Sequence, residues 1–104
     1  MMSPEVVRLF TTTKSPTCHR GLGFDKPNTE RPEWSSTIDE AGPQVYGHTG
    51  YTGPVFWVDP RNDIIYIFLT NRVNPTRDSK IFNSSGIRGN IHYQILKALA
   101  PDTL

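Results

Sequence analysis

The sequence of 104 residues has a single cysteine, Cys18, so it cannot form a disulfide within the chain. It also lacks the C-x-x-C and H-x-x-x-H spacings of zinc sites. Eleven Lys and Arg stand against ten Asp and Glu, with the signs mixed, so no basic face for nucleic acid is evident. No apolar run approaches the roughly 18 residues of a membrane span. We therefore expect no metal or other cofactor, no nucleic-acid partner and no membrane span, and the compartment stays open.

The length bounds the organisation of the chain. It allows one domain at most, large enough for a real core but short for an enzyme with a buried site and a lid. The size therefore suggests a piece of a larger protein.

The most informative stretch runs from Val45 to Leu69, and we interpret it as a β-hairpin. Residues 64–69 are all apolar or aromatic and half are β-branched, which favours a strand covered on both faces. Residues 59–63 contain Pro60, which presets φ, together with Asn and Asp that can bond to the backbone. This composition predicts a turn of about four or five residues between two strands.

A helix is expected at each end of the chain. Ser3-Pro4-Glu5 offers a capping serine, a proline suited to the first helical position and an acidic residue near the positive end of the dipole, which predicts a helix to about Thr12. A second helix is predicted from about 86 to 100, capped by Ser84 or Ser85 and ended by Pro101. Its single apolar stripe is expected to face the core and consists of Ile87, Ile91, Ile95, Ala98 and Leu99.

Between the first helix and the hairpin, the glycine-rich run 21–24 predicts a short strand. Residues 25–44 are rich in proline and polar side chains, which predicts a long surface loop. The fold class is therefore α+β: an antiparallel sheet built on a central hairpin and packed by an N-terminal and a C-terminal helix.

The strongest motif is His48-Thr49-Gly50, within G-H-T-G-Y-T-G, followed by W-V-D-P at 57–60 and L-T-N-R at 69–72. This ordered set resembles the C-terminal part of the serine β-lactamase and penicillin-binding-protein-like superfamily, particularly the class C β-lactamase and esterase branch. The third active-site motif there is Lys-Thr-Gly or His-Thr-Gly on an inner strand. The resemblance covers about residues 3–100. It implies a partial β-lactamase-like fold, with 1–104 a single partial domain from the C-terminal end of a longer hydrolase.

The resemblance implies roles for four residues. In the family, a serine attacks a carbonyl and two backbone N–H groups hold the oxyanion, one of them just after the motif glycine; that residue is Tyr51 here. His48 would supply positive charge or a hydrogen bond near the substrate carboxylate or the general base. The Thr49 hydroxyl would contact the substrate, and Gly50 would let it lie flat along the strand edge.

Two of the family's three catalytic motifs are absent from the sequence, because no Ser-x-x-Lys, Tyr-x-Asn or Ser-x-Asn occurs. In the family these motifs come earlier, on the helical domain. We therefore expect the chain to be inactive alone and to have the remainder of the parent hydrolase as its partner. The parent activity stays open among β-lactamase, D-Ala-D-Ala peptidase and esterase, with His48 in place of Lys leaning toward the last two. The resemblance suggests the periplasm or cell envelope.

The family's first strands pair beside its last strand, so the edge of 64–69 is expected to be unpaired here and to favour a homo-oligomer. The alternative is a non-catalytic interaction module that retains the sheet. A small enzyme using Cys18 is a weaker candidate. His92 is interpreted as a surface or packing residue, and Trp34 and Trp57 as core or loop anchors.

Overall fold

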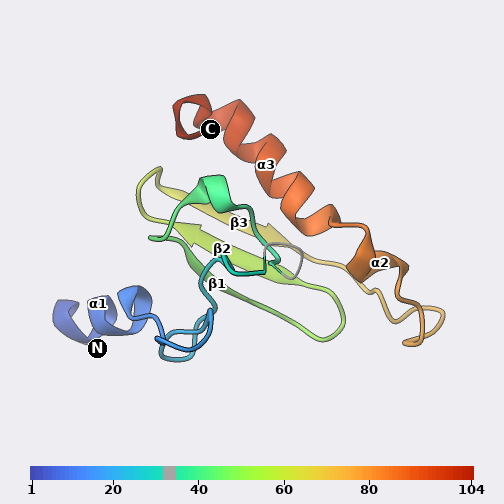
Figure 1. The fold of residues 1–104 in the computed structure, drawn as a ribbon, viewed down its shortest axis with the longest axis horizontal. Coiled ribbons are helices and arrows are strands. Elements are labelled where there is room, and N and C mark those ends of the chain that lie inside the picture. The colour runs from blue at the N-terminus through green and yellow to red at the C-terminus, as the bar shows by residue number, and fades with distance from the viewer. Residues whose placement is uncertain (32–34) are drawn as a thin grey trace.

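The computed structural model describes residues 1–31 and 35–104, and it confirms the α+β class (Figure 1). Three strands form one antiparallel sheet in the order β1-β2-β3, namely β1 (Tyr46–Thr49), β2 (Val55–Asp59) and β3 (Ile64–Phe68). The helices are α1 (Pro4–Thr12), the single turn α2 (Ile81–Ser84) and α3 (Ile87–Leu99). Short 3-10 turns occupy Asp39–Ala41 and Pro101–Thr103. No helix in the described ranges is both long and apolar enough to cross a bilayer.

The predicted hairpin is present as β2 and β3, but the motif lies on a third strand, β1. An additional turn separates β1 from β2, and it is closed by hydrogen bonds from the Gly50 N–H to the Pro54 carbonyl (2.8 Å) and from the Gly53 N–H to the Gly50 carbonyl (3.0 Å). Gly53 has φ +110°, which only glycine adopts without strain. Pro54 therefore ends a turn, where its missing N–H costs no sheet hydrogen bond.

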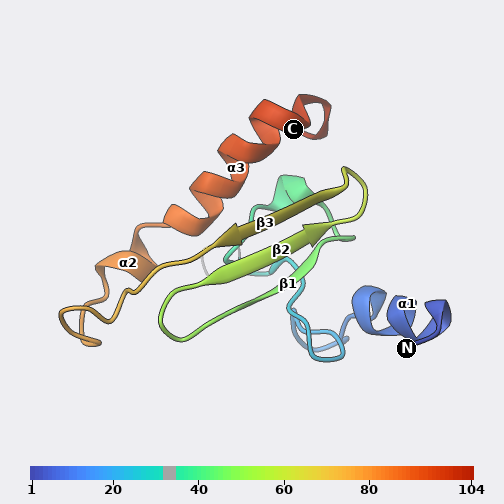
Figure 2. The same ribbon diagram turned by 180° about the vertical axis from the view of Figure 1, so that it is seen from behind.

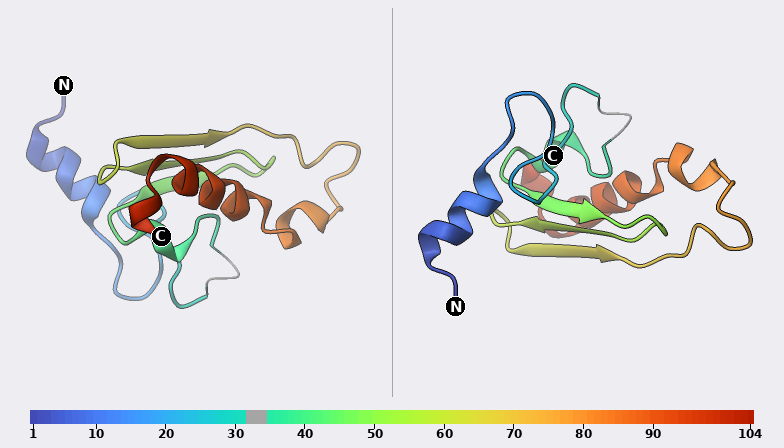
Figure 3. Two further views of the ribbon diagram at one scale, coloured as in Figure 1. Left: turned by 90° about the horizontal axis from the view of Figure 1, so that it is seen from above. Right: turned by 90° about the horizontal axis from the view of Figure 1, so that it is seen from below.

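The core lies between one face of the sheet and α3, which runs along that face (Figure 3). Trp57 and Tyr66 are paired across β2 and β3 and are both buried there against Leu96. Two side chains also fasten the core to the neighbouring backbone. The Trp57 indole N–H donates to the Ser36 carbonyl (3.2 Å), and the Tyr66 hydroxyl donates to the Arg88 carbonyl (3.1 Å). Trp57 is thus a core anchor as expected, whereas Trp34 lies outside the described residues.

Helix α3 forms where it was predicted, but it presents a different face to the sheet. Its fully buried residues are His92 and Leu96, while Leu99 of the predicted stripe is exposed. In the core, His92 contacts the Thr37 hydroxyl and stacks on the Tyr66 ring. The helix therefore turns His92 toward the sheet, and the aliphatic stripe does not face the core directly. Ile91 and Ile95 are packed at the margin of the core.

Two packing expectations were wrong. Helix α1 has the predicted Ser3 cap, whose hydroxyl accepts from the Val6 N–H (3.3 Å), but none of its residues is buried, so it does not pack on the sheet. Strand β3 is covered on one face only: Ile65 and Ile67 are 66% and 61% exposed. These two residues flank the buried Tyr66 and so face the opposite side of the sheet, and the sheet itself is seen from behind in Figure 2. Alternation along an antiparallel strand places successive residues on opposite faces, and only the α3 face is filled.

The strand predicted at 21–24 is a tight turn. The Gly21 N–H donates to the Phe24 carbonyl (2.8 Å), and Gly23 has φ +91°. A side chain at Gly21 would collide with the Thr13 carbonyl oxygen, so this glycine serves a close backbone approach. The turn is followed by a single antiparallel bridge between Asp25 and Gly47, at the edge of β1. The long loop of 25–44 is present, with one 3-10 turn in it.

Candidate active site

The His-Thr-Gly motif lies on β1, at a sheet edge that is only half covered. Asp25 exchanges two backbone hydrogen bonds with Gly47, at 2.8 and 3.1 Å. Because backbone groups two residues apart point the same way along a strand, those of Thr49 also face this edge, beyond the reach of the Asp25 bridge. Within residues 1–31 and 35–104, no bridge to another segment is formed at this edge of Thr49, although its carbonyl oxygen is contacted by Nδ1 of the neighbouring His48. The Thr49 N–H is therefore the group through which another extended chain can pair with this edge.

The two side chains of the motif point to opposite faces of the sheet. His48 pairs with Phe56, and Phe56 pairs with Ile67, so these three share the outer face, which carries no helix. Thr49 is on the α3 face. The motif is thus placed between two different environments.

On the α3 side, Thr49 borders a polar cavity of about 140 Å³. Charged and polar side chains from four separate segments line it, among them His19, Arg20, Asp25, Ser35, Thr49 and Arg88. On the outer side, an apolar hollow of about 350 Å³ is lined by Pro54, Val55, Phe56, Ile67 and Leu69 together with the motif itself. The polar cavity can take a small charged or hydrogen-bonding group, and the hollow can take an apolar one.

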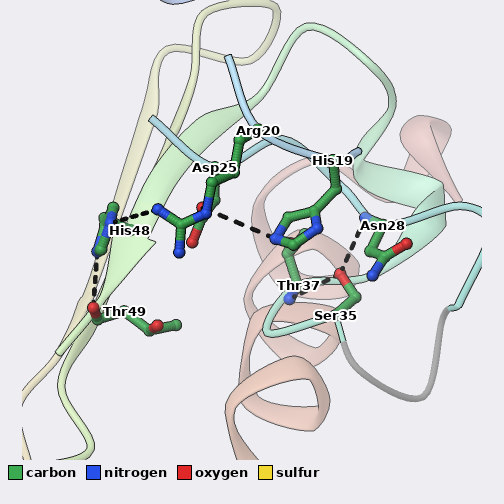
Figure 4. A network of polar contacts seen from close by, with 8 residues as sticks. All are labelled: His19, Arg20, Asp25, Asn28, Ser35, Thr37, His48 and Thr49. Carbon is green, nitrogen blue, oxygen red and sulfur yellow. Dashed lines mark hydrogen bonds and ion pairs between the residues drawn. The ribbon is translucent and has the colours of Figure 1, made fainter. Parts of the chain in front are cut away.

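A network of polar contacts joins the motif to the turn at 21–24 (Figure 4). The Nδ1 of His48 lies 2.7 Å from the Thr49 carbonyl oxygen, and its Nε2 lies 3.4 Å from Nη1 of Arg20. Arg20 Nε in turn forms an ion pair with Asp25 Oδ1 (3.4 Å), and His19 Nε2 lies 3.7 Å from the same oxygen. The Asp25 side chain is only 8% exposed, so the carboxylate is a buried anchor of this network.

Sequence reasoning missed Arg20 and Asp25. Arg20 precedes the glycine-rich run in a segment with no motif, and Asp25 opens the predicted loop of 25–44. No periodicity or spacing relates Arg20 to His48, which follows it by 28 residues. The only local signal is a pair of opposite charges flanking a glycine-rich turn, and that pattern is common at surfaces.

Tyr51 follows the motif in the turn between β1 and β2. Its ring is exposed, and the guanidinium of Arg72 stacks over it with Cζ 4.6 Å from the ring centroid. The Arg72 N–H also donates to the Thr52 carbonyl (2.8 Å), which fastens the turn to the segment after β3. The two backbone bonds that close the turn use the N–H groups of Gly50 and Gly53, so the Tyr51 N–H takes part in neither.

Cys18 is exposed, and the pKa of its thiol is lowered, chiefly by a hydrogen bond from the Arg20 backbone. Within 1–31 and 35–104, no group of three or more His, Cys, Asp or Glu side chains gathers as a metal site would require.

Residues 2–83, which contain β1, β2 and β3, are matched by a family model described as Beta-lactamase. The chain belongs to the beta-lactamase family. The family resemblance seen in the sequence is thereby confirmed, and the matched range contains the positions of Arg20, Asp25 and the motif. The matched range ends before α3.

Several relatives of this beta-lactamase family chain share one name. A "Putative D-alanyl-D-alanine carboxypeptidase" of Escherichia coli O157:H7 is 33% identical over 90 residues, which are 81% of this chain and 20% of that protein. The protein of the same name from Escherichia coli strain K12 is 32% identical over the same shares. One from Salmonella paratyphi B is 41% identical over 49 residues, 42% of this chain and 11% of that protein. The chain thus spans about a fifth of the first two relatives. No solved structure matches it significantly.

Proposed function

We propose that this chain forms one wall of the active site of a β-lactamase-like serine hydrolase, and that the nucleophile comes from another part of the protein. The observation that carries the proposal is the placement of His48-Thr49-Gly50 at the part of the β1 edge beyond the Asp25 bridge, beside a polar cavity. In this proposal, residues 1–104 are the C-terminal segment of the parent hydrolase, and the remainder of that hydrolase is the partner.

The proposed roles follow the motif. The Tyr51 backbone N–H is one donor of the oxyanion hole, because it directly follows the motif and is not used in closing its turn. The Thr49 hydroxyl contacts the substrate from the side of the polar cavity. Gly50 lets the substrate chain approach the strand edge, and His48 lies on the other side of the same edge.

The reaction class is acyl transfer from a peptide or ester to a serine. The names of the relatives support a peptide that ends in D-alanyl-D-alanine as the substrate class. The sequence contains no Ser-x-x-Lys, so the isolated chain is expected to be inactive.

The first experiment incubates the purified 104-residue chain with a fluorescent penicillin and a chromogenic short-chain ester, followed by intact mass measurement. We expect no adduct and no turnover. A stoichiometric adduct would show that the chain has its own nucleophile, with Cys18 as the first residue to test by Cys18→Ala, and would overturn the proposal.

The second experiment restores the missing part. The matching segment of the Escherichia coli relative is replaced by this chain, and labelling of the hybrid by fluorescent penicillin is followed over time. We expect labelling in the relative's portion, strongly reduced by Thr49→Val and retained by Thr49→Ser, because serine keeps the hydroxyl. A hybrid that unfolds cooperatively but takes no label would contradict the assignment.

A second candidate is a non-catalytic interaction module, which the exposed apolar outer face of β3 favours. It predicts that the folded hybrid is never acylated. In this candidate, the module binds its partner through the β3 edge. We also propose that the isolated chain forms a homo-oligomer through the same edge.

A further inference from the structure

The two ring nitrogens of His48 have partners of opposite hydrogen-bonding character. The Nδ1 lies 2.7 Å from the Thr49 carbonyl oxygen, which can only accept a hydrogen bond. The Nε2 lies 3.4 Å from Nη1 of Arg20, and a guanidinium can only donate. Both contacts are satisfied at once only if the hydrogen is on Nδ1 and Nε2 carries a lone pair. The arrangement therefore selects one tautomer of the neutral ring.

Arg20 is itself held in place by Asp25. Its Nε lies 3.4 Å from Oδ1 of Asp25, and Asp25 is fixed by two backbone hydrogen bonds to Gly47, the residue before His48. The Asp25 carboxylate is more than nine-tenths buried, and Oδ1 makes no hydrogen bond within the described residues, so its ion pair with Arg20 is its main compensation. The guanidinium is thus tethered at one end and directed at His48 with the other (Figure 4).

We infer that Arg20 is a positioning residue for the His-Thr-Gly motif: anchored by Asp25, it holds His48 as the Nδ1–H tautomer and places the positive charge of the motif on its own guanidinium. The consequence for the reaction rests on the proposed function. The Nε2 lone pair of His48 is occupied by Arg20, so His48 does not act as a base through that atom. The motif then offers a fixed cation, Arg20, beside the Thr49 hydroxyl.

The tautomer can be measured on the 104-residue chain without any activity. Two-bond nitrogen–proton correlation spectra of the imidazoles, at about pH 8.5 and so well above the usual histidine pKa of about 6.5, distinguish Nδ1–H from Nε2–H rings. Single His→Gln variants at His19, His48 and His92 assign the signals. We expect the His48 ring to be predominantly Nδ1–H, and Arg20→Gln to shift it toward Nε2–H.

Arg88→Gln is the matched control, because Arg88 lines the same polar cavity but its guanidinium lies over the Phe82 ring, with Cζ 5.4 Å from the ring centroid. We expect it to leave the His48 signals unchanged. A predominantly Nε2–H ring in the unsubstituted chain, or an Nδ1–H ring that is insensitive to Arg20→Gln, would overturn the inference. Backbone amide spectra of both variants check that the sheet is intact.

The hybrid with the Escherichia coli relative supplies a second readout. We expect Arg20→Gln to slow labelling by fluorescent penicillin by about tenfold or more, as loss of a hydrogen bond to a charged group does. At position 48, His48→Gln places an acceptor near the former Nε2 and should keep more of the labelling rate than His48→Asn, which keeps only the group near Nδ1.

A labelling rate that is unaffected by Arg20→Gln in a labelled hybrid would overturn the role of Arg20 in the reaction. A folded hybrid that takes no label at all contradicts the proposed function, while the tautomer measurement still decides the positioning role.

Discussion

The imidazole of His92 stacks on the phenol ring of Tyr66, with the two centroids 5.0 Å apart and an interplanar angle of 29°. The ring is fully buried beneath α3, and its Nδ1 lies 2.6 Å from the Thr37 hydroxyl oxygen. Its Nε2 is buried without a hydrogen-bond partner in the described part of the chain. Burial raises the pKa of Tyr66 to about 12, so its hydroxyl keeps the proton that it donates to the Arg88 carbonyl.

The burial of His92 predicts that the fold weakens in mild acid. Desolvation lowers the pKa of the ring in the folded state, and the charge of Asp59 opposes this with a smaller effect. The unfolded chain therefore takes up the proton first, near its ordinary value of about 6.5. This contribution to stability is fully present above that pH and is lost as the pH falls below it, by at most about 1.4 kcal/mol per pH unit. Urea unfolding between about pH 8 and pH 5 measures the slope.

His92→Phe is the control for this slope. Phenylalanine can still stack on Tyr66 but cannot bind a proton, so the part of the slope below about pH 6.5 should shrink. His19→Gln removes a half-exposed histidine instead and should leave most of the slope in place. An equal effect of the two variants would assign the acid sensitivity to charge in general rather than to the buried ring.

Gly47 lies directly before the motif, and we expect any larger residue at this position to destabilise the fold. A Cβ there would collide with the Phe56 carbonyl oxygen and lie 2.9 Å from the Trp57 ring, so either the β1–β2 pairing or the core would have to shift. We expect Gly47→Ala to lower the free energy of unfolding by about 3 kcal/mol or more.

Gly89→Ala is the control for Gly47→Ala, because it makes the same substitution at a position with room for a side chain. It lies inside α3, and a Cβ there meets Ile38 and Thr37 at 3.6 Å, an ordinary contact distance. Because glycine costs about 0.5–1 kcal/mol relative to alanine within a helix, Gly89→Ala should stabilise the fold by about that amount. Thermal denaturation of both variants tests the pair, and a similar loss in each would contradict the local explanation for Gly47.

Asp59 closes the turn between β2 and β3. Its buried carboxylate accepts from the backbone N–H groups of Arg61 (3.0 Å) and Asn62 (3.3 Å) and from the Asn62 side-chain amide (2.7 Å). Asp59→Ala leaves these donors without their acceptor and should cost about 2–3 kcal/mol. Asp59→Asn keeps one acceptor oxygen for the backbone donors, so its cost in urea unfolding should be roughly half as large; equal costs would mean that the charge, and not the acceptor geometry, matters.

The features that the sequence predicts correctly are local. Ser3 caps α1, and the residues around Pro60 form the turn between β2 and β3. Each of these depends on neighbours within a few positions, where propensity and hydrogen bonding act directly.

The features that the sequence misses depend on contacts between distant segments. The turn at Gly21 is shaped by the Thr13 carbonyl, and the face of α3 is chosen by the contacts of His92 rather than by its aliphatic stripe. The same holds for the site: the motif is visible in the sequence, but the contact of Arg20 with His48 exists only because the Asp25 bridge brings the two segments together.

The exposed outer face of β3 predicts self-association of the isolated chain. Ile65, Ile67 and Leu69 are between 61% and 77% exposed, and no charged residue or proline interrupts Ile64–Phe68. An apolar edge strand without such protection pairs readily with another strand, so we expect the isolated chain to self-associate at high concentration.

Sedimentation velocity across a concentration series should show this self-association, and Ile67→Lys should shift the chain toward monomer. Ile81→Lys is the matched control, because Ile81 is 78% exposed but belongs to α2 and not to a strand, and it should leave association unchanged. A strictly monomeric profile at all concentrations would contradict the prediction, and an equal effect of both lysines would mean that net charge, not the β3 edge, governs association.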